Sequence, residues 1–110
     1  MKILQSLRRK GQNIFSTWFP YKGIVCSDDN LPDQLARRRV YFLGEPAWRV
    51  AFLCPCGCKE MVELCLLEQH KPHWTAALDS DARVSLSPSV WKNAGCRSHY
   101  FMRRGQIIWV

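Results

Sequence analysis

Three of the six cysteines lie within five residues, in the run Cys54-Pro55-Cys56-Gly57-Cys58, and a fourth follows far downstream at Cys96. Alternate cysteines cannot bridge one another without strain, because a disulfide needs a Cβ–Cβ distance of about 3.5–4.5 Å. A thiolate cluster is what zinc binds, at about 2.3 Å and in a tetrahedron. Proline and glycine between the cysteines suit a tight turn around an ion. The spacing therefore predicts one structural zinc site.

Cysteine usage also bears on the compartment. Six cysteines in 110 residues are compatible with a secreted disulfide scaffold, but the clustering argues against one, and the first residues carry no signal peptide. No stretch approaches the roughly 20 apolar residues of a membrane span. We expect a reduced cytoplasmic protein in which Cys26 and Cys65 are buried free thiols.

The formal net charge of +7 favours partners with acidic surfaces. Residues 1–25 hold several Lys and Arg and no acid, and Arg37-Arg38-Arg39 forms a second cluster. Aromatic residues do not alternate with arginines as a platform for single-stranded nucleic acid prefers. Nucleic acid is therefore not the partner we favour, and most of this charge is expected to be a solvated face.

Apolar residues recur at helix-like intervals over 3–19 and Pro20 ends the pattern, which predicts a basic N-terminal arm, helical or extended, within residues 1–30. Leu31–Leu35 is expected to form one short helical turn. From Val40 onward the pattern indicates strands near 40–43, 48–53, 61–67, 74–78, 83–86, 100–102 and 106–110. We predict a mainly β domain over 31–110, a small antiparallel sheet or barrel held by one structural zinc. Trp91, Tyr100 and Trp109 are expected to pack in the core or against the sheet. Trp18 and Trp48 are the candidate interface residues.

Five side chains compete for the four positions around zinc: Cys54, Cys56, Cys58, Cys96 and His99. If the four cysteines bind, His99 is free to act as a general base for a serine hydroxyl. Ser89 is the preferred nucleophile, because the apolar Leu86 and Val90 anchor its segment. Ser98 is the alternative, but neighbours on a strand point to opposite faces. If His99 binds the zinc, no convincing base remains.

Other chemistry is less favoured. No third member of a triad is identified, and Asp79, Asp81 and Glu63 remain only possible partners. A catalytic zinc normally has His or carboxylate ligands and an open position, which a thiolate cluster lacks. Redox work by the cysteines would require exposed thiols of low pKa. His70 and His73 are expected in a solvent-exposed loop.

An ordered set of motifs resembles a small bacterial family long filed as a domain of unknown function. The motifs are Leu53-Cys54-Pro55-Cys56-Gly57-Cys58, Pro88-Ser89-Val90-Trp91, Cys96-Arg97-Ser98-His99-Tyr100, and Ile107-Ile108-Trp109, and the resemblance covers about residues 31–110. One departure is Lys59, where members usually carry another glycine.

The resemblance implies a place beside a bacterial ubiquitin-like protein and its activating-enzyme-like and conjugating-enzyme-like partners. It further implies a serine-type peptidase that matures the modifier or removes it from targets, which favours the Ser89 and His99 pair chosen above as the reactive residues of a zinc-stabilised domain. The alternatives are a non-enzymatic zinc-ribbon adaptor of the same pathway and a nucleic-acid-binding zinc module.

Overall fold

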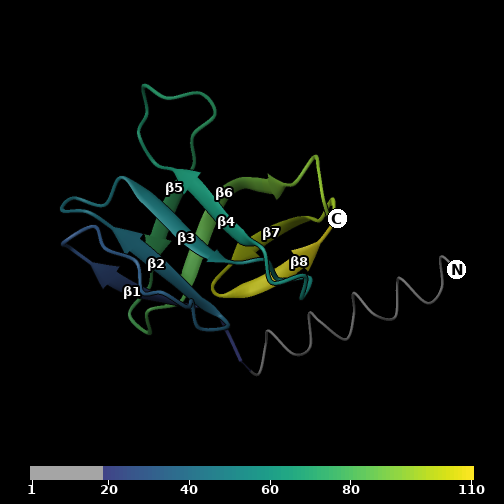
Figure 1. The fold of residues 1–110 in the computed structure, drawn as a ribbon, viewed down its shortest axis with the longest axis horizontal. Coiled ribbons are helices and arrows are strands. Elements are labelled where there is room, and N and C mark those ends of the chain that lie inside the picture. The colour runs from purple at the N-terminus through teal and green to yellow at the C-terminus, as the bar shows by residue number, and fades with distance from the viewer. Residues whose placement is uncertain (1–18) are drawn as a thin grey trace, which may run out of the picture.

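The computed structural model describes residues 19–110, and these residues form strands and no helix (Figure 1). The strands in chain order are β1 (Lys22–Cys26), β2 (Arg39–Leu43), β3 (Arg49–Leu53), β4 (Met61–Cys65), β5 (Thr75–Leu78), β6 (Val84–Trp91), β7 (His99–Arg103) and β8 (Gln106–Trp109). The predicted mainly β class is confirmed. The prediction of a helical turn at Leu31–Leu35 is wrong, because those residues adopt bends and irregular backbone.

The described strands form two four-stranded sheets, in the orders β1-β2-β3-β4 and β5-β6-β7-β8. Five of the six strand pairings in the described residues are antiparallel. The sixth is parallel: β1 pairs with β2 from Lys22 opposite Arg39 to Cys26 opposite Leu43. The sheets are thus predominantly antiparallel, as predicted, with one parallel pair at the β1 edge. A parallel pair needs a crossover rather than a hairpin, and residues 27–38 supply it.

The second sheet is built from hairpins. Asp79 Oδ1 accepts the amides of Asp81 and Arg83, which closes the turn between β5 and β6. Gly105, with φ of +76°, lies in the turn between β7 and β8, where a Cβ would meet Pro20 and Tyr21. Both predicted hairpins are confirmed, since β5 pairs with β6 and β7 with β8 in antiparallel register.

β6 runs past its predicted end because it contains a bulge. Its register with β7 shifts between Leu86, opposite Met102, and Val90, opposite Tyr100. Proline cannot donate to a ladder and is tolerated in strands mainly at edges and bulges. Pro88 lies inside this irregularity, so the strand continues through it to Trp91. The bulge interrupts the pairing of Ser87–Ser89 with β7, so Ser89 has no residue assigned opposite it on that strand.

The inner faces of the two sheets share one core. Side chains with zero to a few per cent exposure meet from both sheets, among them Phe52 and Val50 of the first and Tyr100 and Met102 of the second. The sheets are also joined at one end, where Val84 donates its amide to the carbonyl of Tyr21 at 3.1 Å. Burial of this apolar surface is the main stabilising term available to the fold.

The predicted positions of the aromatic residues are only partly confirmed. Tyr100 is fully buried and packs edge-on against the half-buried Trp109, as expected. Trp91 was predicted to pack in the core or against the sheet; it is not a core residue, because it is 68% exposed. Trp48 is exposed and donates a hydrogen bond to Asp29. Trp18 and the helical pattern over 3–19 fall wholly or largely outside the described residues, and the division at residue 30 stays a prediction.

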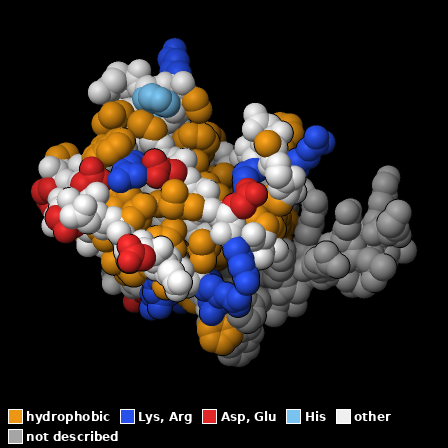
Figure 2. Space-filling view, viewed as in Figure 1, with side chains coloured by type: hydrophobic (Ala, Val, Ile, Leu, Met, Phe, Trp, Pro, Cys, Tyr) orange, Lys and Arg blue, Asp and Glu red, His pale blue; other side chains and the backbone are white. Residues whose placement is uncertain are grey.

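The surface carries a separate basic region. A hollow of about 270 Å³ is lined by Phe19, Pro20, Lys22 and Arg37–Arg39. Lys and Arg side chains gather along the lower part of the face in Figure 2. The residues that line this hollow belong to β1, β2 and the adjoining segments, and none belongs to β6 or β7. Within residues 19–110 there is no helix of a length and apolarity that would cross a lipid bilayer.

Candidate metal centre and active site

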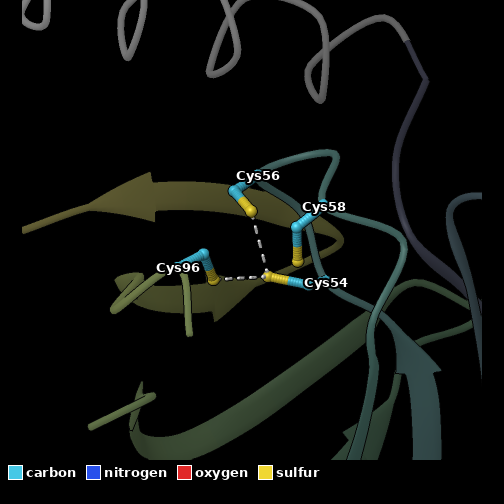
Figure 3. Close-up of side chains that lie close together, drawn as sticks. All are labelled: Cys54, Cys56, Cys58 and Cys96. Carbon is cyan, nitrogen blue, oxygen red and sulfur yellow. Dashed lines mark hydrogen bonds between the residues drawn. The ribbon is translucent and has the colours of Figure 1, made fainter. Parts of the chain in front are cut away.

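The four predicted cysteine ligands lie together. The sulfur atoms of Cys54, Cys56, Cys58 and Cys96 are all within 4.8 Å of one another. Figure 3 shows the four side chains converging on a common point, three from one loop and one from another segment. The Sγ of Cys54 lies 3.4 Å from that of Cys56 and 3.6 Å from that of Cys96. Among the described residues the cluster contains no histidine.

The backbone brings these thiols together by a tight loop between β3 and β4. Cys54 accepts the amide of Gly57 at 3.2 Å and donates its own amide to the carbonyl of Glu60 at 2.8 Å. Gly57 has φ of +90° and Lys59 φ of +67°, so both adopt left-handed backbone. Glycine takes that conformation at little cost, whereas a side chain makes it less favourable. Lys59 thus adopts this turn conformation despite carrying a side chain.

Cys96 reaches the cluster from the loop that precedes β7. Lys92 and Glu60 form an ion pair that ties this loop to the cysteine turn. The buried Ser98 has its Oγ 3.2 Å from the Cys96 sulfur. Cys96 and the turn are therefore held against each other by contacts that involve no metal.

Protonation of the thiols follows their surroundings. Burial raises the pKa of the Cys54 thiol far above its usual value, and burial is also the main cause of the raised pKa of Cys58. For Cys96, burial opposes ionisation, but hydrogen bonds from the Ser98 hydroxyl and amide outweigh it and lower its pKa to about 6. Metal binding needs thiolates, so an ion entering here would release protons.

The donor set fits a zinc ion. In a tetrahedral site with Zn–S bonds of about 2.3 Å, the sulfurs are about 3.8 Å apart, close to the spacing of this cluster. Four cysteines fill the usual coordination number and leave no open position, which is the pattern of structural rather than catalytic sites. The geometry identifies a candidate metal centre without specifying the ion.

A serine and a histidine meet on the opposite, outward side of β7. The Oγ of Ser89 lies 2.9 Å from the Nε2 of His99. With the imidazole neutral and its proton on Nδ1, Nε2 accepts the hydrogen bond that the hydroxyl donates. Leu86 and Val90 are both buried and flank the bulge, as the sequence predicted for the segment that carries Ser89.

Ser98, the last residue before β7, and His99, its first residue, belong to different centres. Ser98 faces inward to the cysteines, where its hydroxyl contacts Cys96, whereas His99 faces outward to Ser89. Ser98 and His99 therefore do not pair with each other, as the sequence predicted. His99 is three residues from Cys96 in the sequence, but its ring bonds to Ser89 and is not part of the sulfur cluster.

Two tryptophans support the pair, and sequence patterns missed both. The Trp91 ring stacks on the His99 ring with centroids 4.7 Å apart and planes 6° from parallel. The indole Nε1–H of Trp74 donates to the carbonyl of Ser89 at 3.2 Å. Only the pairing of β6 with β7 could have revealed the stacking, because that register sets Trp91 directly opposite His99.

No described residue completes a triad. Within residues 19–110, Ser89 is the one hydrogen-bond partner of the His99 ring. The three carboxylates considered from sequence lie elsewhere: Asp79 binds backbone amides of its own turn, Glu63 pairs with Arg49, and Asp81 makes no bond to His99. His70 and His73 bond to backbone carbonyls of their own loop.

The backbone next to Ser89 includes an open strand edge. The amide of Lys92 donates to the carbonyl of Ser98 at 2.9 Å, so Trp91 and His99 form a non-hydrogen-bonded pair. The amide and carbonyl of Trp91 consequently point away from β7. On that side β5 begins only at Thr75, opposite Ser87. Among the described residues, no strand pairs with β6 beside Trp91.

The comparisons agree with this arrangement of residues. No curated protein and no solved structure matches the chain. A family model described as bacterial ubiquitination-like system serine protease (BubE) matches residues 27–110, a range that contains the cysteine cluster and the Ser89–His99 pair. The chain therefore belongs to the BubE family, and the resemblance noted in the sequence is confirmed.

Proposed function

We propose that this protein is a serine-type peptidase that acts on the C-terminal tail of a bacterial ubiquitin-like modifier, either maturing it or releasing it from targets. The observation that carries the proposal is the 2.9 Å contact between Ser89 Oγ and His99 Nε2 in a chain of a family described as serine proteases. The family description further supports partners within a ubiquitination-like system.

The proposed reaction is acyl transfer in two steps. Ser89 Oγ attacks the carbonyl carbon of the scissile amide while its proton passes to His99 Nε2. The C–N bond breaks, His99 gives that proton to the leaving amine, and the tail remains as an ester on Ser89. Water then attacks the ester, losing a proton to His99, and the C–O bond to Ser89 breaks as the proton returns to its hydroxyl.

We assign the four cysteines to a structural zinc. Zinc supplies no bond-breaking chemistry in such a closed thiolate site; it clamps the turn after β3 to the loop before β7. His99 is three residues beyond Cys96, so this clamp fixes the start of the strand that carries the proposed base. The metal then stabilises the fold and, through it, the alignment of the pair.

The open edge beside Trp91 suits an extended substrate. Adding a strand to a sheet edge is a common way for a β domain to bind a peptide, with backbone hydrogen bonds providing affinity. The amide and carbonyl of Trp91 are free of ladder partners among the described residues and are two residues from Ser89. We propose that the modifier's tail pairs here, with its scissile carbonyl next to the hydroxyl.

Further assignments accompany this proposal. The six cysteines are all unpaired, which suits the reducing cytoplasm. We retain residues 1–30 as a basic arm beside the catalytic domain over 31–110. The rival function, a zinc-ribbon adaptor of the same pathway, differs from the peptidase in needing no Ser89.

The test uses the purified full chain and a ubiquitin-like protein carrying extra residues beyond its tail, with cleavage followed by intact mass. Ser89→Ala and His99→Ala should each lower cleavage by about 10³-fold or more. Ser80→Ala, in an exposed turn, is the matched control and should cleave normally. Metal content and circular dichroism should be the same in all variants.

The other outcomes separate the rivals. Loss of cleavage in Ser98→Ala but not in Ser89→Ala would reassign the nucleophile. A wild-type chain that binds the modifier without cutting it would identify an adaptor.

A further inference from the structure

The outer face of the second sheet carries a groove of about 280 Å³ next to the proposed reactive pair. Its walls are mainly apolar and include Ala77 of β5, Pro88 of β6 and Phe101 of β7, and Arg103 also lines it. Pro88 directly precedes Ser89 in the bulge. The groove therefore begins beside the serine, on the opposite side from Trp91.

Strand alternation places the groove in line with the pair. His99, Phe101 and Arg103 are alternate residues of β7 and share its outward face. Leu86 is opposite Met102, so the register sets Ser85 beside Arg103, and the amide of Arg104 indeed donates to Ser85 Oγ at 2.9 Å. Arg103 thus stands at the far end of a row that starts at His99.

Arg103 is presented as an anion-binding group. Its guanidinium carbon lies 4.6 Å from the centroid of the Phe101 ring, and the side chain is exposed. No carboxylate of residues 19–110 pairs with it. A guanidinium stacked on an aromatic ring keeps its N–H donors in a plane, and that fork matches a carboxylate in two hydrogen bonds.

We infer that this groove is a specificity subsite that takes an extended peptide segment bearing an Asp or Glu side chain, which Arg103 binds while Phe101 and Pro88 contact the apolar residues between. The inference rests on the proposed function, because it treats Ser89 as the point of cleavage. Ser85, the residue of β6 beside Arg103, is four residues from Ser89, which corresponds to a distance of about 13 Å along an extended strand. An extended substrate covers that length in about four residues, so the acidic residue lies about four residues from the scissile bond.

The test pairs Arg103→Glu with Arg104→Glu. Both substitutions change the charge by the same amount, but Arg104 lies in the turn after β7 and does not line the groove. Each protein is given a mixture of peptides from a digested bacterial proteome, and the residues flanking each cut are read by mass spectrometry. A fluorophosphonate probe, which is too small to need the groove, reports separately on the reactivity of Ser89.

The wild type and Arg104→Glu should favour Asp or Glu about four residues from the cut by about tenfold or more. Arg103→Glu should lose that preference and favour Lys or Arg there, with probe labelling unchanged in all three proteins. Three results would overturn the subsite in enzyme that the probe labels: wild type that cuts without the acidic preference, Arg103→Glu that keeps the preference, or wild type that leaves the peptide mixture uncut. Failure of wild-type Ser89 to react with the probe would instead count against the proposed function.

Discussion

The cysteine cluster and the Ser89–His99 pair are only three residues apart at Cys96 and His99, yet their surroundings differ in accessibility. Four sulfurs converge until no ligand position is left, and neighbouring loops are tied across them. The serine and histidine meet on an outward face, beside an exposed tryptophan and an open strand edge. Under the proposed function, this contrast is a division of labour in which one centre would hold the fold and the other would stay accessible to the substrate.

Removing the metal should give the largest effect. A structural zinc contributes on the order of 10 kcal/mol to folding, which is comparable with the whole stability of a small domain. Cys58→Ser is the best variant, because Cys58 is exposed and its loss cannot be ascribed to core packing. We expect unfolding by circular dichroism and loss of bound zinc, as with a strong chelator.

The control is Cys26→Ser, which changes a half-buried cysteine outside the cluster and should keep both metal and fold. A metal-free protein with an unchanged circular dichroism spectrum would contradict the structural role of the cluster, because the fold would then not depend on a metal.

Trp91→Ala should have an intermediate effect, confined to the reactive pair. Stacking of aromatic rings contributes about 0.5–1.5 kcal/mol, so loosening His99 should lower kcat by up to about tenfold. The melting temperature should hardly change, because Trp91 is 68% exposed. Trp91→Phe retains a stacking ring and should recover most of the rate. Full activity in Trp91→Ala would show that the stack does not orient the histidine.

Lys59→Gly should have the smallest effect, a small change in stability that arises in the cysteine turn. Left-handed backbone costs a non-glycine residue about 1–2 kcal/mol, and the greater freedom of unfolded glycine offsets part of the gain. We expect stabilisation of less than about 1 kcal/mol in chemical denaturation with cleavage unchanged. Lys59→Ala keeps the Cβ and should not stabilise; equal results for both variants would exclude a backbone cause.

The hairpins and the cysteine cluster could be predicted because their causes are local. Polar turn residues follow one another at Asp79–Asp81, and the spacing of the cysteines fixes the turn that gathers them. The parallel pairing of β1 with β2 has no such signature, since it depends on residues that a crossover separates. Pro88 likewise reads as a strand end unless the bulge is known.

The candidate active site shows the same limit. The choice of Ser89 and His99 rested on residue chemistry and on the faces of a strand, and their contact depends on the register of β6 with β7. The supporting roles of Trp91 and Trp74 could not be foreseen, because hydrophobicity alone does not distinguish a core tryptophan from one that covers a histidine. The bulge that displaces Ser89 also required the three-dimensional pairing.

Within residues 19–110, no carboxylate is hydrogen-bonded to the His99 ring, which affects the turnover rate expected of the proposed peptidase. A buried aspartate holds the tautomer and steadies the imidazolium in fast digestive proteases, and replacing it lowers turnover by about 10⁴-fold. Here a stacked ring fixes the plane of the imidazole without neutralising its charge. If Ser89 and His99 are the proposed catalytic pair, we expect slow turnover, and recognition of the tail rather than the speed of the chemistry would then decide which bond is broken.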